Sequence, residues 1–144
     1  MARDRKVGNL DTATAAYIAG LVDGEGTITL TRLHRNENRR LVLSISNNEL
    51  PILEFVRTAV GAGRITTKRT YNPKHAPSFT YQVSSRQALD LLRHLMPNLR
   101  SYKAGRARLA LDQYLKLTPR NGKYDERLKA ARSEFEMRLL AIKL

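Results

Sequence analysis

The order of local patterns along the chain constrains the fold more than any other feature, because a helix and a strand pair follow one another twice. Residues 13–22 have a helical pattern that begins after Asp11 and Thr12, which can cap a helix. Residues 27–33 and 41–46 then alternate apolar and polar side chains with the two-residue period of a strand. The polar loop between them predicts a β-hairpin.

The same order returns in the next part of the chain. A second helical pattern begins near Pro51, which suits a first helical turn, and ends at Gly61 and Gly63. Residues 64–70 and 78–84 form a second predicted hairpin, joined by a segment rich in turn residues. The two halves resemble each other in predicted structure, although they show no matching sequence repeat.

Three further helical patterns complete the chain, over residues 86–96, 103–117 and 125–144. A length of 144 residues is enough for one core but short for two ordinary domains. We therefore expect a single domain over residues 1–144, in which residues from about 124 to the end form a C-terminal helical extension.

Two antiparallel hairpins predict an α+β fold, with one four-stranded sheet that carries helices on one face and leaves the other open. The helix-covered face would carry Ile28, Leu30, Leu41, Leu43, Ile45, Ile65, Phe79, Tyr81 and Val83. The open face would carry Thr29, Thr31, Ser44, Ser46, Arg64, Thr66, Lys68, Thr80 and Gln82. This second set forms hydrogen bonds or is cationic, and it includes no carboxylate.

The charge of the chain indicates a polyanionic partner. The formal net charge is +13 and the isoelectric point is about 10.6. Residues 64–86 include basic side chains but no Asp or Glu. A basic, twisted strand pair can enter the DNA major groove and contact base edges. The alternative is a solvated sheet face, where threonine is common because it suits strands.

The sequence gives no sign of a membrane or secretory context. The basic N-terminal residues are followed by no apolar signal segment, and the chain contains no cysteine. No apolar run approaches the length of a membrane span. We expect the protein to act inside a cell without a membrane partner, and the compartment stays open.

The first predicted helix combines small side chains with an acidic end. Ala16, Ala19 and Gly20 would let another helix approach closely. Asp23 and Glu25 follow at the C-terminal end, where the helix dipole disfavours anions unless a cation lies nearby. A Mg²⁺ ion bound to a carboxylate would supply that charge and would suit phosphodiester hydrolysis. The alternative is an ordinary helix stop with solvated acids.

The stretch "YIAGLVDGEGTI" resembles the signature of the LAGLIDADG homing endonucleases, with residues 18–26 aligned position by position. The resemblance implies an αββαββα core, the order read independently above. One copy of the motif implies a homodimer whose paired first helices meet at Ala16, Ala19 and Gly20. It also implies cleavage of a long, pseudo-palindromic double-stranded DNA site, leaving staggered ends with 3′ overhangs.

Site residues follow from this resemblance, position by position. Glu25 would bind the catalytic Mg²⁺ together with the backbone carbonyl of Gly24, and Mn²⁺ or Ca²⁺ could replace Mg²⁺ for binding. Asp23 would support the helix end. Asn47 would position water, and Lys103 would support the water or the phosphate.

Two departures from the family pattern affect this assignment. The spacing before Lys103 is slightly long, which leaves Tyr102 and Arg100 as rivals for its role. Pro51 occupies a place where some members carry an active-site arginine, so no arginine role is assigned there.

The predicted DNA contacts lie on the open face of the sheet and on the first hairpin loop. They are Thr29, Thr31, Arg35, Arg39, Arg40, Ser44, Arg64, Thr66, Lys68, Thr80 and Gln82.

Two other functions remain open at this point. A transcription regulator would keep the fold and lack the chemistry, whereas a group I intron RNA maturase would use the same basic surface on structured RNA.

Overall fold

The computed structural model describes residues 6–68, 74 and 76–144. The end of the predicted strand at residues 69–70 therefore lies outside the described part, as does the side chain of Lys68. The elements, in chain order, are α1 Thr12–Glu25, β1 Gly26–Thr31, β2 Arg40–Asn47, α2 Leu50–Val60, β3 Arg64–Lys68, β4 Ser78–Ser84, α3 Ser85–Leu95, the 3₁₀ turn η1 Met96–Asn98, α4 Lys103–Gln113 and α5 Glu126–Ala141.

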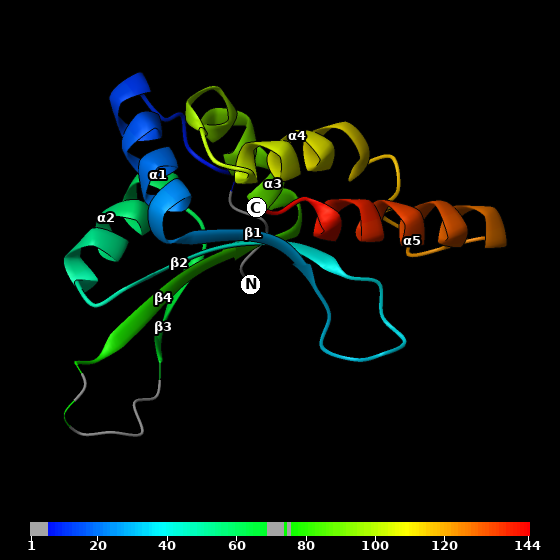
Figure 1. The fold of residues 1–144 in the computed structure, drawn as a ribbon, viewed down its shortest axis with the longest axis horizontal. Coiled ribbons are helices and arrows are strands. Elements are labelled where there is room, and N and C mark those ends of the chain that lie inside the picture. The colour runs from blue at the N-terminus through cyan, green and yellow to red at the C-terminus, as the bar shows by residue number, and fades with distance from the viewer. Residues whose placement is uncertain (1–5, 69–73, 75) are drawn as a thin grey trace.

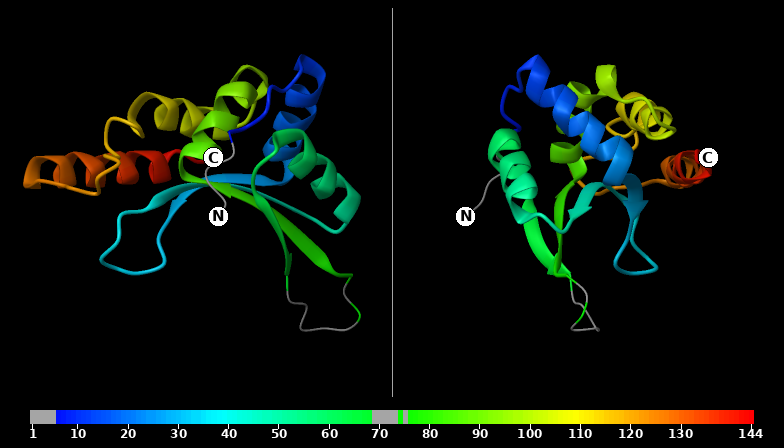
Figure 2. Two further views of the ribbon diagram at one scale, coloured as in Figure 1. Left: turned by 180° about the vertical axis from the view of Figure 1, so that it is seen from behind. Right: turned by 60° about the vertical axis from the view of Figure 1, so that its left-hand side comes forward.

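The four strands form one antiparallel sheet in the order β1-β2-β4-β3, in which β2 and β4 join the two hairpins. The register places Ile28 opposite Leu43 and Ile45 opposite Tyr81, so apolar side chains of neighbouring strands share one face. All helices lie on this side, and the sheet arches beneath them (Figure 1 and Figure 2). The predicted α+β architecture with an open sheet face is confirmed.

The core lies between the sheet and the helices. Seven of the nine residues predicted to face inward are buried, and Ile65 and Phe79 are partly buried against the same cluster. Leu91 and Leu92 of α3 and Val56 of α2 are fully buried and complete the apolar layer above the strands. Strand alternation thus identified the covered face correctly.

The first helix is longer than predicted. It continues through Asp23 and Gly24 to Glu25, so the acids lie in its last turn and not beyond its end. Gly24 therefore does not break the helix, and the reversal occurs at Gly26. A Cβ atom at Gly26 would lie 2.6 Å from Val22 Cα, so only glycine permits the close turn from α1 into β1.

The C-terminal helices pack beside this core. α4 is shorter than the predicted 103–117, and α5 begins after Asp125, whose carboxylate accepts a 2.7 Å hydrogen bond from Leu128 N. Arg106 of α4 is buried and donates to Ile28 O at 2.8 Å and to Ile142 O at 2.7 Å. Its guanidinium thereby ties the chain end to β1. Within the described residues, no helix has the length and apolar character needed to cross a membrane.

Candidate active site and nucleic-acid interface

The end of α1 meets the end of β2 at a pair of polar side chains. Asn47 Nδ2 donates to Glu25 Oε2 at 2.5 Å, and Asn47 Oδ1 accepts from Glu49 N at 2.7 Å. The second bond fixes the orientation of the amide, because it leaves the NH₂ group directed at the carboxylate. Glu25 is exposed. The pair borders a surface depression lined by Leu21, Glu25, Ser46, Asn47, Asn48, Glu49, Ile52 and Ser78.

Lys103, at the start of α4, contacts the same end of α1. Its Nζ donates to Val22 O at 2.8 Å and to Asp23 O at 2.9 Å. These carbonyls lie in the last turn of α1, at the negative end of the helix dipole, and Val22 O also accepts a hydrogen bond from Gly26 N. Lys103 is 8% exposed. Burial lowers the pKa of its ammonium group, and the nearby charge of Asp23 partly opposes that shift.

Asp23 connects α1 to the segment that carries Lys103. Its carboxylate accepts hydrogen bonds from Arg100 N at 2.8 Å, Ser101 N at 3.0 Å and Ser101 Oγ at 2.6 Å. Burial opposes ionisation, but these bonds and the charge of Lys103 outweigh it and lower the pKa of the carboxyl. Asp23 thus holds residues 100–101 immediately before Lys103, whereas the rival Arg100 is exposed.

The outer side of α1 is a stripe of small residues. Ala16, Gly20 and Gly24 are exposed and four residues apart, so they lie one above another along the helix. A Cβ atom built on either glycine meets nothing within 4 Å. Ala19 is different, because it is fully buried in the core of the chain itself. The prediction that Ala19 lies in a dimer interface is therefore wrong.

The open face of the sheet presents most of the predicted DNA contacts. Thr31, Arg64 and Thr66 are exposed, and Thr29, Arg40, Ser44, Thr80 and Gln82 are half-buried. Arg35, in the first hairpin loop, is also exposed. The hydroxyls of Ser46 and Thr80 lie 3.0 Å apart on neighbouring strands and share a hydrogen bond. This polar surface faces away from the helices, as Figure 2 shows for the sheet.

Arg39 departs from that pattern. Its guanidinium donates to Glu136 Oε1 of α5 at 3.1 Å and is only half-exposed. Arg39 thus also makes a contact inside the protein, and its predicted contact with DNA stays a prediction.

Comparisons with known proteins bear on this arrangement. No protein-family model and no curated protein matches the sequence. Solved structures match: the homing endonuclease I-CvuI bound to its DNA target with calcium has a TM-score of 0.74, 21% identity, and coverage of 92% of this chain and 83% of that chain. The fold is that of the LAGLIDADG homing endonucleases. The resemblance of residues 18–26 is thus confirmed at the level of the fold.

Two further structures extend the LAGLIDADG likeness. The archaeal intron-encoded homing endonuclease I-Vdi141I, complexed with DNA, has a TM-score of 0.59 and 15% identity over 90% of this chain and 84% of that chain. I-GzeII, described as a LAGLIDADG homing endonuclease in complex with a DNA target, has a TM-score of 0.67 and 14% identity over 92% of this chain. The match covers 44% of I-GzeII.

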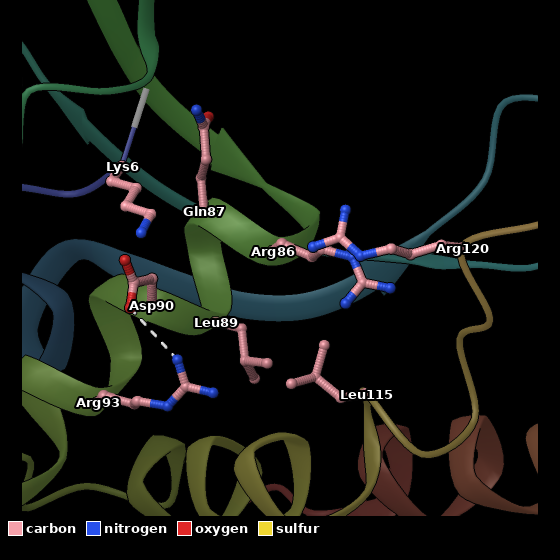
Figure 3. A pocket seen from close by; sticks show the side chains of 8 residues that line it. All are labelled: Lys6, Arg86, Gln87, Leu89, Asp90, Arg93, Leu115 and Arg120. Carbon is pink, nitrogen blue, oxygen red and sulfur yellow. Dashed lines mark hydrogen bonds and ion pairs between the residues drawn. The ribbon is translucent and has the colours of Figure 1, made fainter. Parts of the chain in front are cut away.

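A second depression, lined mainly by cationic side chains, lies on the helical side of this LAGLIDADG fold (Figure 3). Its lining comprises Lys6, Arg86, Gln87, Leu89, Asp90, Arg93, Leu115 and Arg120. Arg93 is paired with Asp90 at 3.2 Å, and Arg86 donates to Thr118 O at 2.9 Å. The sequence places Arg86 at the end of the basic stretch 64–86, but in the structure it lies in α3, on this helical surface. The basic charge is therefore shared between the two sides of the molecule.

Sequence reasoning missed the groups that hold the site residues. Ser101 and the amide of Arg100 orient Asp23, and Glu49 N orients Asn47. A short polar side chain next to a helix start is common, so Ser101 carried no distinctive signal. Glu136 gave a weak signal, because it lies four residues after Arg132 on a helix face shared with Leu139.

Proposed function

We propose that this protein is a homodimeric, metal-dependent DNA endonuclease that cuts a long, pseudo-palindromic double-stranded site. The carrying observation is the exposed Glu25 carboxylate, held by Asn47 at the same end of α1 that presents the small-residue stripe. One chain thus carries an acidic side chain, a small-residue helix face that another helix could pack against, and an open, basic sheet face. The proposal includes staggered cuts with 3′ overhangs.

The donor groups at the end of α1 fit a hard divalent cation. The described residues contain no group of three or more His, Cys, Asp or Glu side chains placed to hold a metal, so one subunit offers Glu25 and the neighbouring Gly24 carbonyl. Mg²⁺ commonly binds through one or two carboxylates, waters and substrate phosphates, and this small donor set suits it. When bound, Mg²⁺ would lower the pKa of water and stabilise the leaving oxygen. Mn²⁺ or Ca²⁺ could replace Mg²⁺ for binding of the DNA.

The protein's own residues then have separate roles. Asn47 keeps the Glu25 carboxylate in place and offers an amide near the attacking water. Lys103 places a positive charge behind the acidic turn, where it stabilises the α1 carbonyls and the approaching phosphate. Asp23 fixes the segment that carries Lys103.

A homodimer would complete the site. Two α1 helices packed through Ala16 and Gly20 would bring the two Glu25 carboxylates to the centre, one for each strand. The match covers 44% of I-GzeII, so one copy of this fold fills about half of that chain, in agreement with a site built from two such units.

Each sheet would contact one half of the target. The net charge of +13 favours DNA phosphates, while the Thr, Ser, Gln and Arg side chains of the open face offer donors and acceptors to base edges. I-CvuI and I-Vdi141I are both described in complex with DNA.

A randomised duplex DNA library, incubated with the protein in Mg²⁺ or in EDTA, tests the proposal. Cuts at a preferred sequence in Mg²⁺ and none in EDTA are expected. Binding to a preferred sequence without any cut would identify a transcription regulator instead. Absence of both binding and cutting would contradict the DNA proposal and leave intron RNA as the partner to examine.

A further inference from the structure

α5 lies beside the first hairpin (Figure 1). Two of its charged side chains are buried and contact the base of that hairpin. Arg132 is 2% exposed and Glu136 is 5% exposed. They pair at 3.2 Å, four residues apart on the same helix. Burying two charges is costly unless they form many well-placed hydrogen bonds, so the partners of this pair are informative.

The pair holds Arg39 at three points. Arg39 N donates to Glu136 Oε2 at 3.3 Å, and its guanidinium donates to Glu136 Oε1 at 3.1 Å. Arg132 donates in turn to the Arg39 carbonyl. Both backbone groups of Arg39 are thus bound by side chains of α5. We call Arg39, Arg132 and Glu136 the hairpin clamp.

Arg132 also fixes the connection that leads into α5. It donates to Leu117 O at 3.2 Å and to the Thr118 hydroxyl. The ring of Tyr114 lies 5.0 Å from its guanidinium carbon, and Phe135 packs against the same group at 5.7 Å. A side chain held on so many sides has little freedom to move, so the hairpin clamp is a rigid anchor.

The hairpin beyond the clamp has little contact with the rest of the protein. Residues 31–38 are all exposed, and the described contacts include a local turn in which Glu37 N donates to His34 O at 3.1 Å. The loop projects from the sheet on the side away from the helices (Figure 1). A small rotation at the base would displace this loop by a larger distance at its tip, which carries Arg35.

We propose that the hairpin clamp sets the direction of the first hairpin and thereby determines discrimination among the outer base pairs of each half-site. Arg39 and Glu136 are positioning residues in this role, because they act through the loop and not by contact with DNA. The inference rests on the proposed function for its DNA component, whereas the coupling of α5 to the hairpin can be measured in the free protein.

Two variants with opposite charge changes test the clamp. Glu136→Gln raises the net charge by one, and Arg39→Gln lowers it by one. Glu134→Gln and Arg138→Gln make the same two changes on exposed positions of α5 and are the matched controls. If direct attraction to DNA mattered, the two clamp variants would change DNA affinity in opposite directions. A positioning role predicts that both weaken discrimination at the same outer base pairs.

The DNA measurement is binding in Ca²⁺ to targets with single base-pair changes along each half-site. A mismatch at an outer base pair is expected to cost the wild type roughly 10-fold in affinity and each clamp variant less than about 3-fold. Mismatches near the centre should cost all proteins the same. Equal profiles for clamp variants and controls, or a uniform loss along the site, would overturn the proposal.

Hydrogen exchange of the free protein provides the test that needs no DNA. The two hydrogen-bonded amides of this segment that the structure describes outside the strand ladder, those of Glu37 and of residue 39, should exchange about 10-fold faster in Arg39→Gln than in Arg138→Gln, with the rest of the sheet unchanged. Arg39→Gln leaves the Arg132–Glu136 pair intact, so it decides the question even if Glu136→Gln fails to fold. Unchanged exchange would refute the clamp. Faster exchange in a protein that neither binds nor cuts DNA would instead refute the proposed function alone.

Discussion

The side-chain amide of Asn47 donates a 2.5 Å hydrogen bond to the carboxylate of Glu25, although the two residues lie 22 positions apart. Asn47 ends β2 and Glu25 ends α1, so the sheet and the helix jointly fix the acid. The carboxylate stays exposed while one of its oxygens is held. This combination is what a metal ligand needs, because a fixed donor loses little freedom on binding.

Glu25→Gln should abolish cleavage and retain site binding in Ca²⁺. The change removes the charge that a divalent cation requires but alters none of the sheet surface. Strand cleavage and a binding assay on the same target measure the two effects. Glu54→Gln, an exposed change on α2, is the control and should cut normally. Undiminished cutting by Glu25→Gln would remove Glu25 from the mechanism.

Lys103→Met should reduce both stability and cleavage. Without the ammonium group, Asp23 O loses this donor and Val22 O keeps only its bond from Gly26 N, so the free energy of unfolding should fall by about 1–3 kcal/mol. Denaturant titration measures the loss, and single-turnover cleavage below the melting range measures the chemistry. Lys116→Met, at an exposed position, should change neither. A stable variant with full activity would contradict both roles.

Asp23 should make the free energy of unfolding fall when the pH is lowered into the acidic range. Its pKa is lowered in the folded protein from an ordinary value of 3.8, so its ionised form is stabilised by folding. That stabilisation is fully present above pH 3.8 and is lost as the pH falls through the folded pKa. The stability difference between wild type and Asp23→Asn should therefore shrink on acidification. Asp112→Asn, at an exposed position, is the matched control for the loss of one carboxylate.

Gly20→Leu should separate folding from dimer formation. A Cβ atom at Gly20 meets no other atom of the chain within 4 Å, and leucine favours helix over glycine by roughly 1 kcal/mol. The isolated subunit should thus remain folded, while the paired helices can no longer approach closely. Sedimentation should show a monomer, and cleavage should be lost. Ala131→Leu places the same larger side chain at an exposed position of α5 and should leave the association state unchanged.

Arg64→Ala should weaken DNA binding more than Arg120→Ala. Arg64 lies on the open sheet face, whereas Arg120 lines the depression on the helical side. The slope of log affinity against log salt should fall by about 1 for Arg64→Ala, if its charge neutralises a phosphate. No change in slope is expected for Arg120→Ala. The reverse ranking would place the DNA on the helical side.

Local patterns predicted the elements well but not their ends. Alternation identified the covered strand face because each inward side chain is set by its own strand. The extent of α1 was missed, since glycine has a weak helix propensity and tertiary contacts at Asp23 outweigh it. Ala19 was assigned to the wrong side of α1, because both sides of that helix carry small or apolar residues.

The sequence by itself determined the order of helices and strands, the apolar and polar faces of the sheet, the cationic character and the motif at residues 18–26. Each of these depends on residue type and on spacings of a few positions. Only the tertiary structure decided that Lys103 binds the end of α1, 81 residues away, and that Arg39 pairs with Glu136, 97 residues away. Such contacts arise where packed elements meet, and local periodicity carries no information about which distant polar groups will share that place.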